Sequence, residues 1–232
     1  MRNSKFVSEV KGVDYLLVMA ILMVAMTGCI EMKPIPMDTL VGTLPAVEKI
    51  PLKAALVTPD PPTHRVMYTP PSMTGRKEPV DQTEQMNESM WPLGRELAKA
   101  SRDAFSQVFD QIASLRQLPL PGEYDLVIQP KISVVRMEGY MESFLLSVNA
   151  WQDLSCDWTM AVLDNKGIPI LSRQGTTPKK RIVVKPSFST EGHMNTMGVE
   201  SSELLVSLVK EWVFMLAVSP EIRDYVRQMQ KP

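Results

Sequence analysis

Cysteine and histidine are scarce in this chain of 232 residues. It has two cysteines, Cys29 and Cys156, and two histidines, His64 and His193. A catalytic zinc centre needs about three protein ligands drawn from His, Cys, Asp and Glu, and a serine or cysteine nucleophile needs a base beside it. His64 lies among prolines and His193 follows a Glu-Gly pair, so both are expected in loops. We therefore expect no metal site, no cofactor and no catalytic triad.

Sequence patterns of the common enzyme families are also missing. The chain has no G-x-S-x-G, no H-E-x-x-H, no P-loop and no G-x-G-x-x-G. Its formal net charge is −1, and without a polybasic patch a nucleic-acid partner is not expected.

Two groups of charged residues remain as candidates for chemistry. Asp153, Asp157 and Asp164 come nearest to a carboxylate cluster, and we interpret them as turn and strand-edge acids rather than as a glycosidase pair. The basic run Lys179-Lys180-Arg181 is expected to be a solvated strand edge that discourages strand addition. Contact with an anionic envelope polymer or lipid headgroup is the alternative for this run.

The first thirty residues contain the most specific signal in the chain. Basic residues at positions 2, 5 and 11 precede an unbroken apolar run over 15–26, and Thr27-Gly28-Cys29 follows. The run is shorter than the roughly 20 apolar residues that a membrane-spanning helix needs. It fits the ~7–15-residue apolar core of a secretory signal peptide, so we expect an exported protein.

The segment Met26-Thr27-Gly28-Cys29 resembles the lipobox of bacterial lipoproteins. This resemblance implies cleavage before Cys29, attachment of lipid with acyl chains such as palmitate, and anchoring to a membrane through that lipid. An uncleaved anchor helix with an incidental cysteine is the alternative. Because Ile30 and not aspartate follows the cysteine, the resemblance favours the outer membrane, with the protein facing the periplasm.

The expected organisation has three parts. Residues 1–28 are the signal peptide, 29–50 a lipidated N-terminus and proline-containing tether, and 51–232 a single domain. A Pro-rich excursion at 58–90 is long enough to be functional or disordered. With Cys29 lipidated, Cys156 is a lone cysteine in a predicted strand. We expect it to be a buried structural residue, and a reactive or pairing thiol is the alternative.

Hydrophobic periodicity predicts an α+β domain in which two helices cover one face of a mostly antiparallel sheet of four to six strands. One helix is expected from Trp91-Pro92 to Leu115. A C-terminal helix capped by Ser201 or Ser202 precedes a shorter one capped by Ser219. The apolar face of the C-terminal helix contains Leu204, Leu205, Leu208, Val209, Trp212, Val213 and Leu216. Strands are expected at 52–57, 65–68, 124–128, 132–135, 144–151, 154–163, 168–171 and 181–184.

The order of these elements is similar to that of envelope-assembly accessory lipoproteins. Examples are the lipoprotein partner of the outer-membrane lipopolysaccharide translocon and the lipoprotein activators of peptidoglycan synthases. We expect a non-enzymatic, membrane-anchored lipoprotein that serves as an accessory or assembly subunit of a cell-envelope complex and binds a protein partner. The alternative is an envelope hydrolase or a carrier of an apolar ligand. A deep pocket with polar groups of shifted pKa would favour the alternative, and a filled core with an exposed apolar patch would favour the adaptor.

Overall fold

The computed structural model describes residues 34–45, 49–58, 64–71, 78–144, 147–184 and 190–230. These residues belong to one compact unit that starts at Pro34. The expected signal peptide and Cys29 lie outside the described residues, so they remain predictions from the sequence. Within the described ranges, no helix is both long and apolar enough to cross a membrane.

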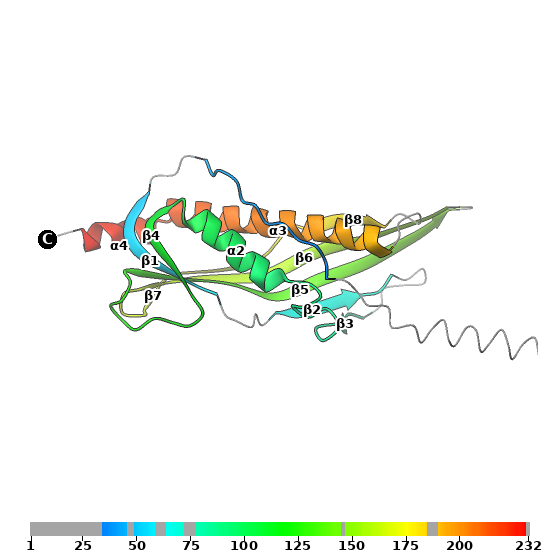
Figure 1. Cartoon of the computed structure of the whole chain (residues 1–232), viewed down its shortest axis with the longest axis horizontal. Coiled ribbons are helices and arrows are strands. Elements are labelled where there is room, and N and C mark those ends of the chain that lie inside the picture. Colours follow the sequence, from blue (N-terminus) through cyan, green and yellow to red (C-terminus); the bar gives the residue numbers. More distant parts are fainter. Residues whose placement is uncertain are drawn as a thin grey trace, which may run out of the picture. The chain divides into compact units, whose positions relative to one another are not determined.

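Eight strands of the described ranges form one mixed sheet (Figure 1). The strands are β1 (Ile50–Val57), β2 (Arg65–Thr69), β3 (Val80–Asp81), β4 (Phe109–Leu115), β5 (Leu126–Phe144), β6 (Ser147–Asp164), β7 (Pro169–Thr176) and β8 (Lys180–Val184). The long hairpin of β5 and β6 is the centre of the sheet. Along its outer edge, β6 pairs with β8 near the hairpin turn and with β7 farther away.

The expectation of a mostly antiparallel sheet of four to six strands is wrong. The sheet has eight strands in the described ranges, and β1 pairs in parallel with both β4 and β5, while β2 pairs in parallel with β5. The pairings of β2 with β3, and of β6 with β5, β7 and β8, are antiparallel. The parallel pairings arise because the chain crosses back over the sheet through a helix before β4, as parallel neighbours require.

Strand β5 has two parallel neighbours along one edge. It pairs with β1 at residues 126–128 and with β2 at residues 134–138. Pro130 falls in the stretch between them, and Pro169 begins the edge strand β7. Both prolines therefore lie where a missing backbone donor is tolerated, as their chemistry requires.

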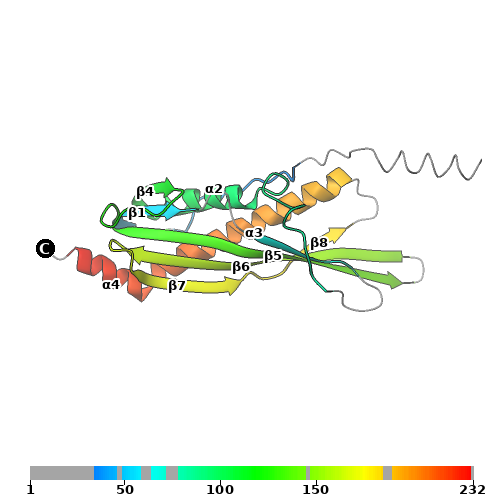
Figure 2. The same cartoon turned by 90° about the horizontal axis from the view of Figure 1, so that it is seen from below.

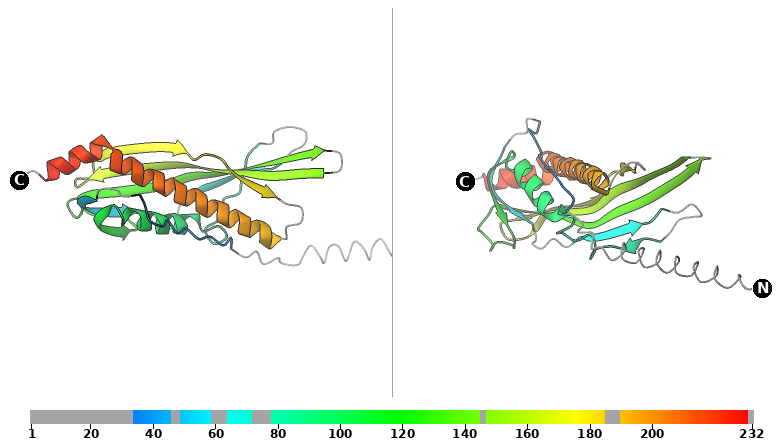
Figure 3. Two further views of the ribbon diagram at one scale, coloured as in Figure 1. Left: turned by 90° about the horizontal axis from the view of Figure 1, so that it is seen from above. Right: turned by 45° about the vertical axis from the view of Figure 1, so that its right-hand side comes forward.

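Three helices are described: α2 (Leu93–Phe105), α3 (Thr190–Val218) and α4 (Pro220–Met229). Helices α2 and α3 lie side by side on one face of the sheet, and α3 crosses the strands diagonally (Figures 1 and 3). All seven residues of the predicted apolar face of α3 are buried. Trp212 meets Trp158 of β6 edge-on, with ring centroids 5.8 Å apart. The predicted Ser219 cap is confirmed, because its hydroxyl accepts from the Ile222 N–H at 3.4 Å.

Two predicted helix boundaries are wrong. Helix α2 ends at Phe105, and residues 109–115 form β4, which pairs with β1 from Ile50 opposite Phe109 onward. Helix α3 begins at Thr190, so Ser201 and Ser202 lie inside it and donate to the carbonyls four residues earlier, at 2.6 and 2.8 Å.

The predicted strands around the central hairpin are also redrawn. The segments 124–128 and 132–135 are parts of one long strand, β5. The strand expected at 144–151 is divided, because Phe144 ends β5 and pairs with Ser147, which begins β6. Apolar residues continue through the turn between β5 and β6, so the hydrophobic pattern of the sequence contains no sign of that turn.

The Pro-rich excursion contributes ordered elements in its described parts. Strands β2 and β3 come from it, and β3 pairs with the outer edge of β2. Near its end, the Glu88 carboxylate accepts from the N–H groups of Gly94 at 3.0 Å and Arg95 at 2.7 Å. This carboxylate therefore satisfies two of the free donors at the start of α2.

Residues 34–45 correct the expectation of a tether over 29–50. They run as an extended segment between α2 and α3 (Figure 3), and Ile35 and Val41 are buried there. We call residues 34–45 the strap. It is part of the folded unit.

Candidate functional site

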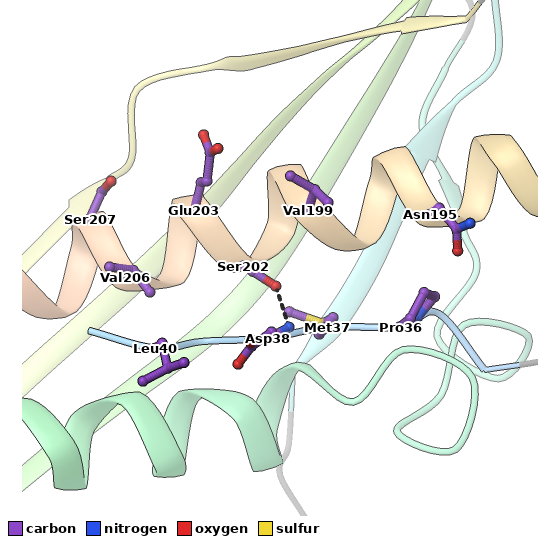
Figure 4. Close-up of a pocket in the computed structure, with 10 residues that line it drawn as sticks. All are labelled: Pro36, Met37, Asp38, Leu40, Asn195, Val199, Ser202, Glu203, Val206 and Ser207. Carbon is purple, nitrogen blue, oxygen red and sulfur yellow. Dashed lines mark hydrogen bonds between the residues drawn. The ribbon is translucent and has the colours of Figure 1, made fainter. Parts of the chain in front are cut away.

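The strap is fixed to α3 by a close backbone approach. The Asp38 N–H donates to the Ser202 hydroxyl at 3.0 Å, a contact drawn in Figure 4. A methyl group at Gly198 would lie 1.8 Å from the Pro36 carbonyl oxygen, which is far inside any permitted contact. The lack of a side chain at Gly198 is therefore what lets the strap lie directly on the helix.

The strap is fixed to α2 by side chains. The Thr39 hydroxyl donates to the Glu96 carboxylate at 2.9 Å, and both residues are buried. Gln107, just after α2, accepts from the Leu44 N–H at 2.9 Å and donates to the Gly42 carbonyl at 2.9 Å. The strap is thus held along its length by polar contacts to both helices.

An open groove of about 650 Å³ lies between the strap and α3 (Figure 4). Apolar side chains line much of it: Pro36, Met37, Leu40, Val199 and Val206. Leu40 is 71% exposed and Val199 is 56% exposed. We call this surface the strap groove.

The carboxylates beside the strap groove already have partners. Asp38 lies 3.4 Å from the Lys99 ammonium, and Glu203 lies 2.5 Å from that of Lys180. The polar rim is therefore internally compensated, and the apolar side chains are what the groove offers to another molecule.

The two histidines lie in different parts of the fold. His64 immediately precedes β2, and burial lowers its pKa, with the charge of Glu88 acting in the opposite direction. His193 lies in the first turn of α3, where burial also lowers its pKa. Within the described ranges, no three His, Cys, Asp or Glu side chains are grouped closely enough to hold a metal ion.

Each of the three β6 carboxylates has a partner nearby. Asp153 accepts from Arg181 of β8 at 3.0 Å. Asp157 contacts Arg136 of β5 and accepts from the Thr176 hydroxyl at 2.8 Å. Asp164 accepts from two backbone N–H groups of the β6–β7 turn, each at 2.8 Å. These contacts join neighbouring strands and close a turn, so they explain the three acids structurally.

Cys156 is fully buried on the helix-facing side of β6. Its N–H donates to the Thr177 hydroxyl at 2.9 Å, and its carbonyl accepts from the Thr177 N–H at 2.9 Å. Burial raises the pKa of the Cys156 thiol to about 12, and the charge of Asp157 adds to this effect. The environment is that of a structural cysteine.

The basic run at 179–181 contacts carboxylates on both faces of the sheet. Lys179 lies 2.6 Å from Glu138 of β5, and Lys180 contacts Glu200 and Glu203 of α3. Arg181 points the opposite way from Lys180, as alternation along a strand requires. These intramolecular ion pairs involve all three cations of the run.

Figure 2 shows the molecule with β5, β6 and β7 in front of α3. On the face of the sheet opposite the helices, an aromatic pair and a cation lie on the three neighbouring strands β5, β6 and β8. Tyr140 of β5 stacks on Trp151 of β6 with ring centroids 5.5 Å apart and planes 10° apart. The Arg181 guanidinium lies 4.9 Å from the Trp151 ring, so it contacts that ring as a cation–π pair. The Tyr140 hydroxyl donates to Glu138 at 2.7 Å, and this bond raises the pKa of Tyr140. Cross-strand contacts of this kind stabilise the pairing of β5, β6 and β8.

No family model and no curated protein matches the chain. Among solved structures, a DUF330 protein from Xanthomonas campestris aligns over 83% of this chain and 94% of its own, with 14% identity and a TM-score of 0.46. A homologue of neuraminyllactose-binding haemagglutinin from Helicobacter pylori aligns over 83% and 97%, with 12% identity and a TM-score of 0.46. A minor lipoprotein from Acinetobacter baumannii aligns over 71% and 91%, with 10% identity and a TM-score of 0.34. At these values the likenesses assign no function to the chain.

The strap groove is thus the candidate functional site. It was not found from the sequence, because the prolines and irregular pattern of residues 34–45 are also typical of a tether. The one available signal was the set of apolar residues Ile35, Met37, Leu40 and Val41 among those prolines. What the groove can do chemically is bind an apolar segment.

Proposed function

We propose that this protein is a non-enzymatic lipoprotein, anchored through Cys29 to the outer membrane and facing the periplasm. In this proposal it is an accessory or assembly subunit of a bacterial cell-envelope complex. The observation that carries the proposal is the exposed apolar strap groove beside an extensive buried core. The lipobox-like segment supports the anchor.

The strap groove favours an adaptor over a hydrolase or a carrier. It is an open surface groove, and its carboxylates Asp38 and Glu203 are paired with lysines. The described groups with the largest pKa shifts, Cys156, Asp81 and Glu221, lie elsewhere. An exposed apolar patch of this kind is typical of protein interaction sites.

The position of the strap limits where a partner can be met. Only residues 30–33 separate Cys29 from Pro34, and a fully extended chain of that length spans about 18 Å at most. A lipid on Cys29 would therefore keep the start of the strap close to the membrane surface. The partner expected for the strap groove is a protein of that same membrane.

The anchor is tested by labelling cells with radioactive palmitate. We expect Cys29→Ala to leave an uncleaved, unlabelled precursor, because the acceptor thiol is lost. Cys156→Ser is the matched control and should label like the natural protein. Undiminished labelling of Cys29→Ala would contradict the anchor.

The adaptor role is tested by site-specific photo-crosslinking in intact cells. A photoreactive residue at Leu40 should give an adduct with one membrane protein, and Val199→Glu should abolish it by placing a charge in the groove. Leu120 is also 71% exposed but lies in a distant loop, so it is the matched control position. Equal adducts from positions 40 and 120 would contradict the role.

A further inference from the structure

A second groove lies where α3 ends and α4 begins. Its volume is about 510 Å³, and its walls come from the last turn of α3, from α4 and from the start of β1. The residues that carry the argument are Phe214, Val218, Val226, Lys49, Arg223 and Arg227. We call it the α4 groove.

The apolar wall of the α4 groove faces solvent. Phe214 is 64% exposed and Val218 is 43% exposed, although both belong to a helix whose opposite side fills the core. A helix that packs one face on a sheet usually presents polar residues on its other face. The outward side of α3 departs from that pattern, with Val199 at 56% exposure near its other end.

The remaining wall of the α4 groove is positively charged. Lys49, Arg223 and Arg227 line it, and no carboxylate is among its described lining residues. Lys49 lies 3.4 Å from Asp110, and Arg227 lies 3.2 Å from Asp224, and both are exposed pairs of little strength. Arg223 has no ion-pair partner among the described residues. The groove therefore combines an apolar wall with the uncompensated positive charge of Arg223 and with two cations, Lys49 and Arg227, whose weak exposed pairs a partner's carboxylates could replace.

We propose that the α4 groove is the docking site for an acidic amphipathic segment of a partner protein. Its apolar side chains would lie against Phe214, Val218 and Val226, and its carboxylates would face Arg223, Arg227 and Lys49. Helix-in-groove recognition supplies this combination of apolar anchors and flanking charge. Charge complementarity selects such a segment over a basic one. The inference rests on the proposed function in one respect only, namely that the partner is a protein of the cell envelope.

The test uses the full-length protein purified in detergent and two synthetic fluorescent peptides of about 14 residues, four helical turns. One peptide places Leu and Phe on one face and Glu on the other, and the second replaces every Glu by Lys. Fluorescence anisotropy should show saturable binding of the acidic peptide and none of the basic one. Arg223→Glu should weaken binding about tenfold or more, since attraction becomes repulsion.

Matched controls separate the groove from general effects. Arg102→Glu makes the same charge change at an exposed position of α2 and should leave binding unchanged. Phe214→Ser should weaken binding, whereas Leu118→Ser, at a position of similar exposure, should not. Each variant is first shown to keep the natural unfolding midpoint.

Five outcomes would overturn the proposal, four of them in the binding experiment. These are no binding of the acidic peptide, equal binding of both peptides, binding that Arg223→Glu leaves intact, or peptide displacement by vesicles of phosphatidylglycerol, which would assign the groove to lipid headgroups. Self-association lost in Arg223→Glu, measured by sedimentation, would assign it to a second copy of the chain and would also overturn the proposal. None of these results depends on lipid at Cys29, so the palmitate experiment can fail separately.

Discussion

Gly198 of α3 lies directly against the Pro36 carbonyl of the strap, where a methyl group would approach that oxygen to 1.8 Å. Neither atom can move aside cheaply, because one is backbone of a long helix and the other is backbone of an extended segment. This contact links the segment that follows the proposed anchor to the helix that closes the core.

Gly198→Ala should therefore destabilise the protein. Alanine is favoured over glycine inside a helix by about 1 kcal/mol, so an effect on the helix alone would raise the unfolding temperature. We expect a lower unfolding temperature instead, together with faster proteolysis within residues 34–45, because the strap must move away. Ser207→Ala, at an exposed position of the same helix, is the control. A more stable Gly198→Ala variant would contradict the close approach.

The sequence was sufficient for elements whose signals are local. The apolar residues of α3 recur every three or four positions, so periodicity locates its buried face. Ser219 and the proline after it are adjacent in sequence, so capping rules locate the start of α4. The boundary between α2 and β4 could not be found in this way. Val108, Ile112 and Leu115 continue the helical spacing, and it is pairing with the distant β1 that makes 109–115 a strand.

The strap and the grooves also depend on contacts between segments that are distant in the sequence, so they could not be predicted. The burial of Ile35 and Thr39 depends on Gly198 and Glu96, which are far away in the chain. The parallel pairings of β5 with β1 and β2 likewise join distant segments. The burial of Cys156 could be predicted, because the apolar residues of its own strand are adjacent to it in sequence.

Trp212 should be a major contributor to stability. It is fully buried and packs edge-on against Trp158. Truncation of a buried tryptophan to alanine costs about 3–5 kcal/mol, a large share of the ~5–15 kcal/mol that holds a typical domain folded. Urea denaturation should show this loss for Trp212→Ala. Phe214→Ala removes an aromatic ring two residues away that is 64% exposed, and it should change the midpoint little. Similar losses in both variants would contradict the assignment of the inner face to the core.

Cys156 should be inert in the folded protein. Its pKa is raised to about 12 by burial, so the thiol stays protonated at neutral and mildly basic pH, and the reactive thiolate is absent. In a Cys29→Ala background, iodoacetamide at pH 8 should react at least about a hundredfold more slowly with the native protein than with the protein in urea. Rapid native alkylation, or a disulfide-linked dimer lost on reduction, would instead indicate a functional thiol.

Glu221 should make the stability of α4 depend on pH. Its carboxylate accepts from the Ser219 hydroxyl at 2.6 Å and from Arg173 of β7 at 3.0 Å. The bond from Ser219 is the largest cause that lowers the pKa of Glu221 from 4.5 to about 2, with Arg173 adding to it. A carboxyl whose pKa is depressed on folding stabilises the folded state above its unfolded pKa, and this stabilisation is lost as the pH falls through the folded value.

Glu221→Gln should therefore be less stable than the natural protein at pH 6, and the difference should shrink as the pH falls from 4.5 towards 2. The measurement is the urea midpoint of both proteins at a series of pH values, so that the acid sensitivity of the rest of the chain cancels in the difference. Asp224→Asn is the control, because Asp224 is an exposed acid of the same helix whose ion pair is with its helical neighbour Arg227. A difference between Glu221→Gln and the natural protein that stays constant over this range would show that the contacts to Ser219 and Arg173 do not depend on the carboxylate charge. In that case Glu221 would still help to attach α4 to β7, but its titration would not be the cause of any pH dependence.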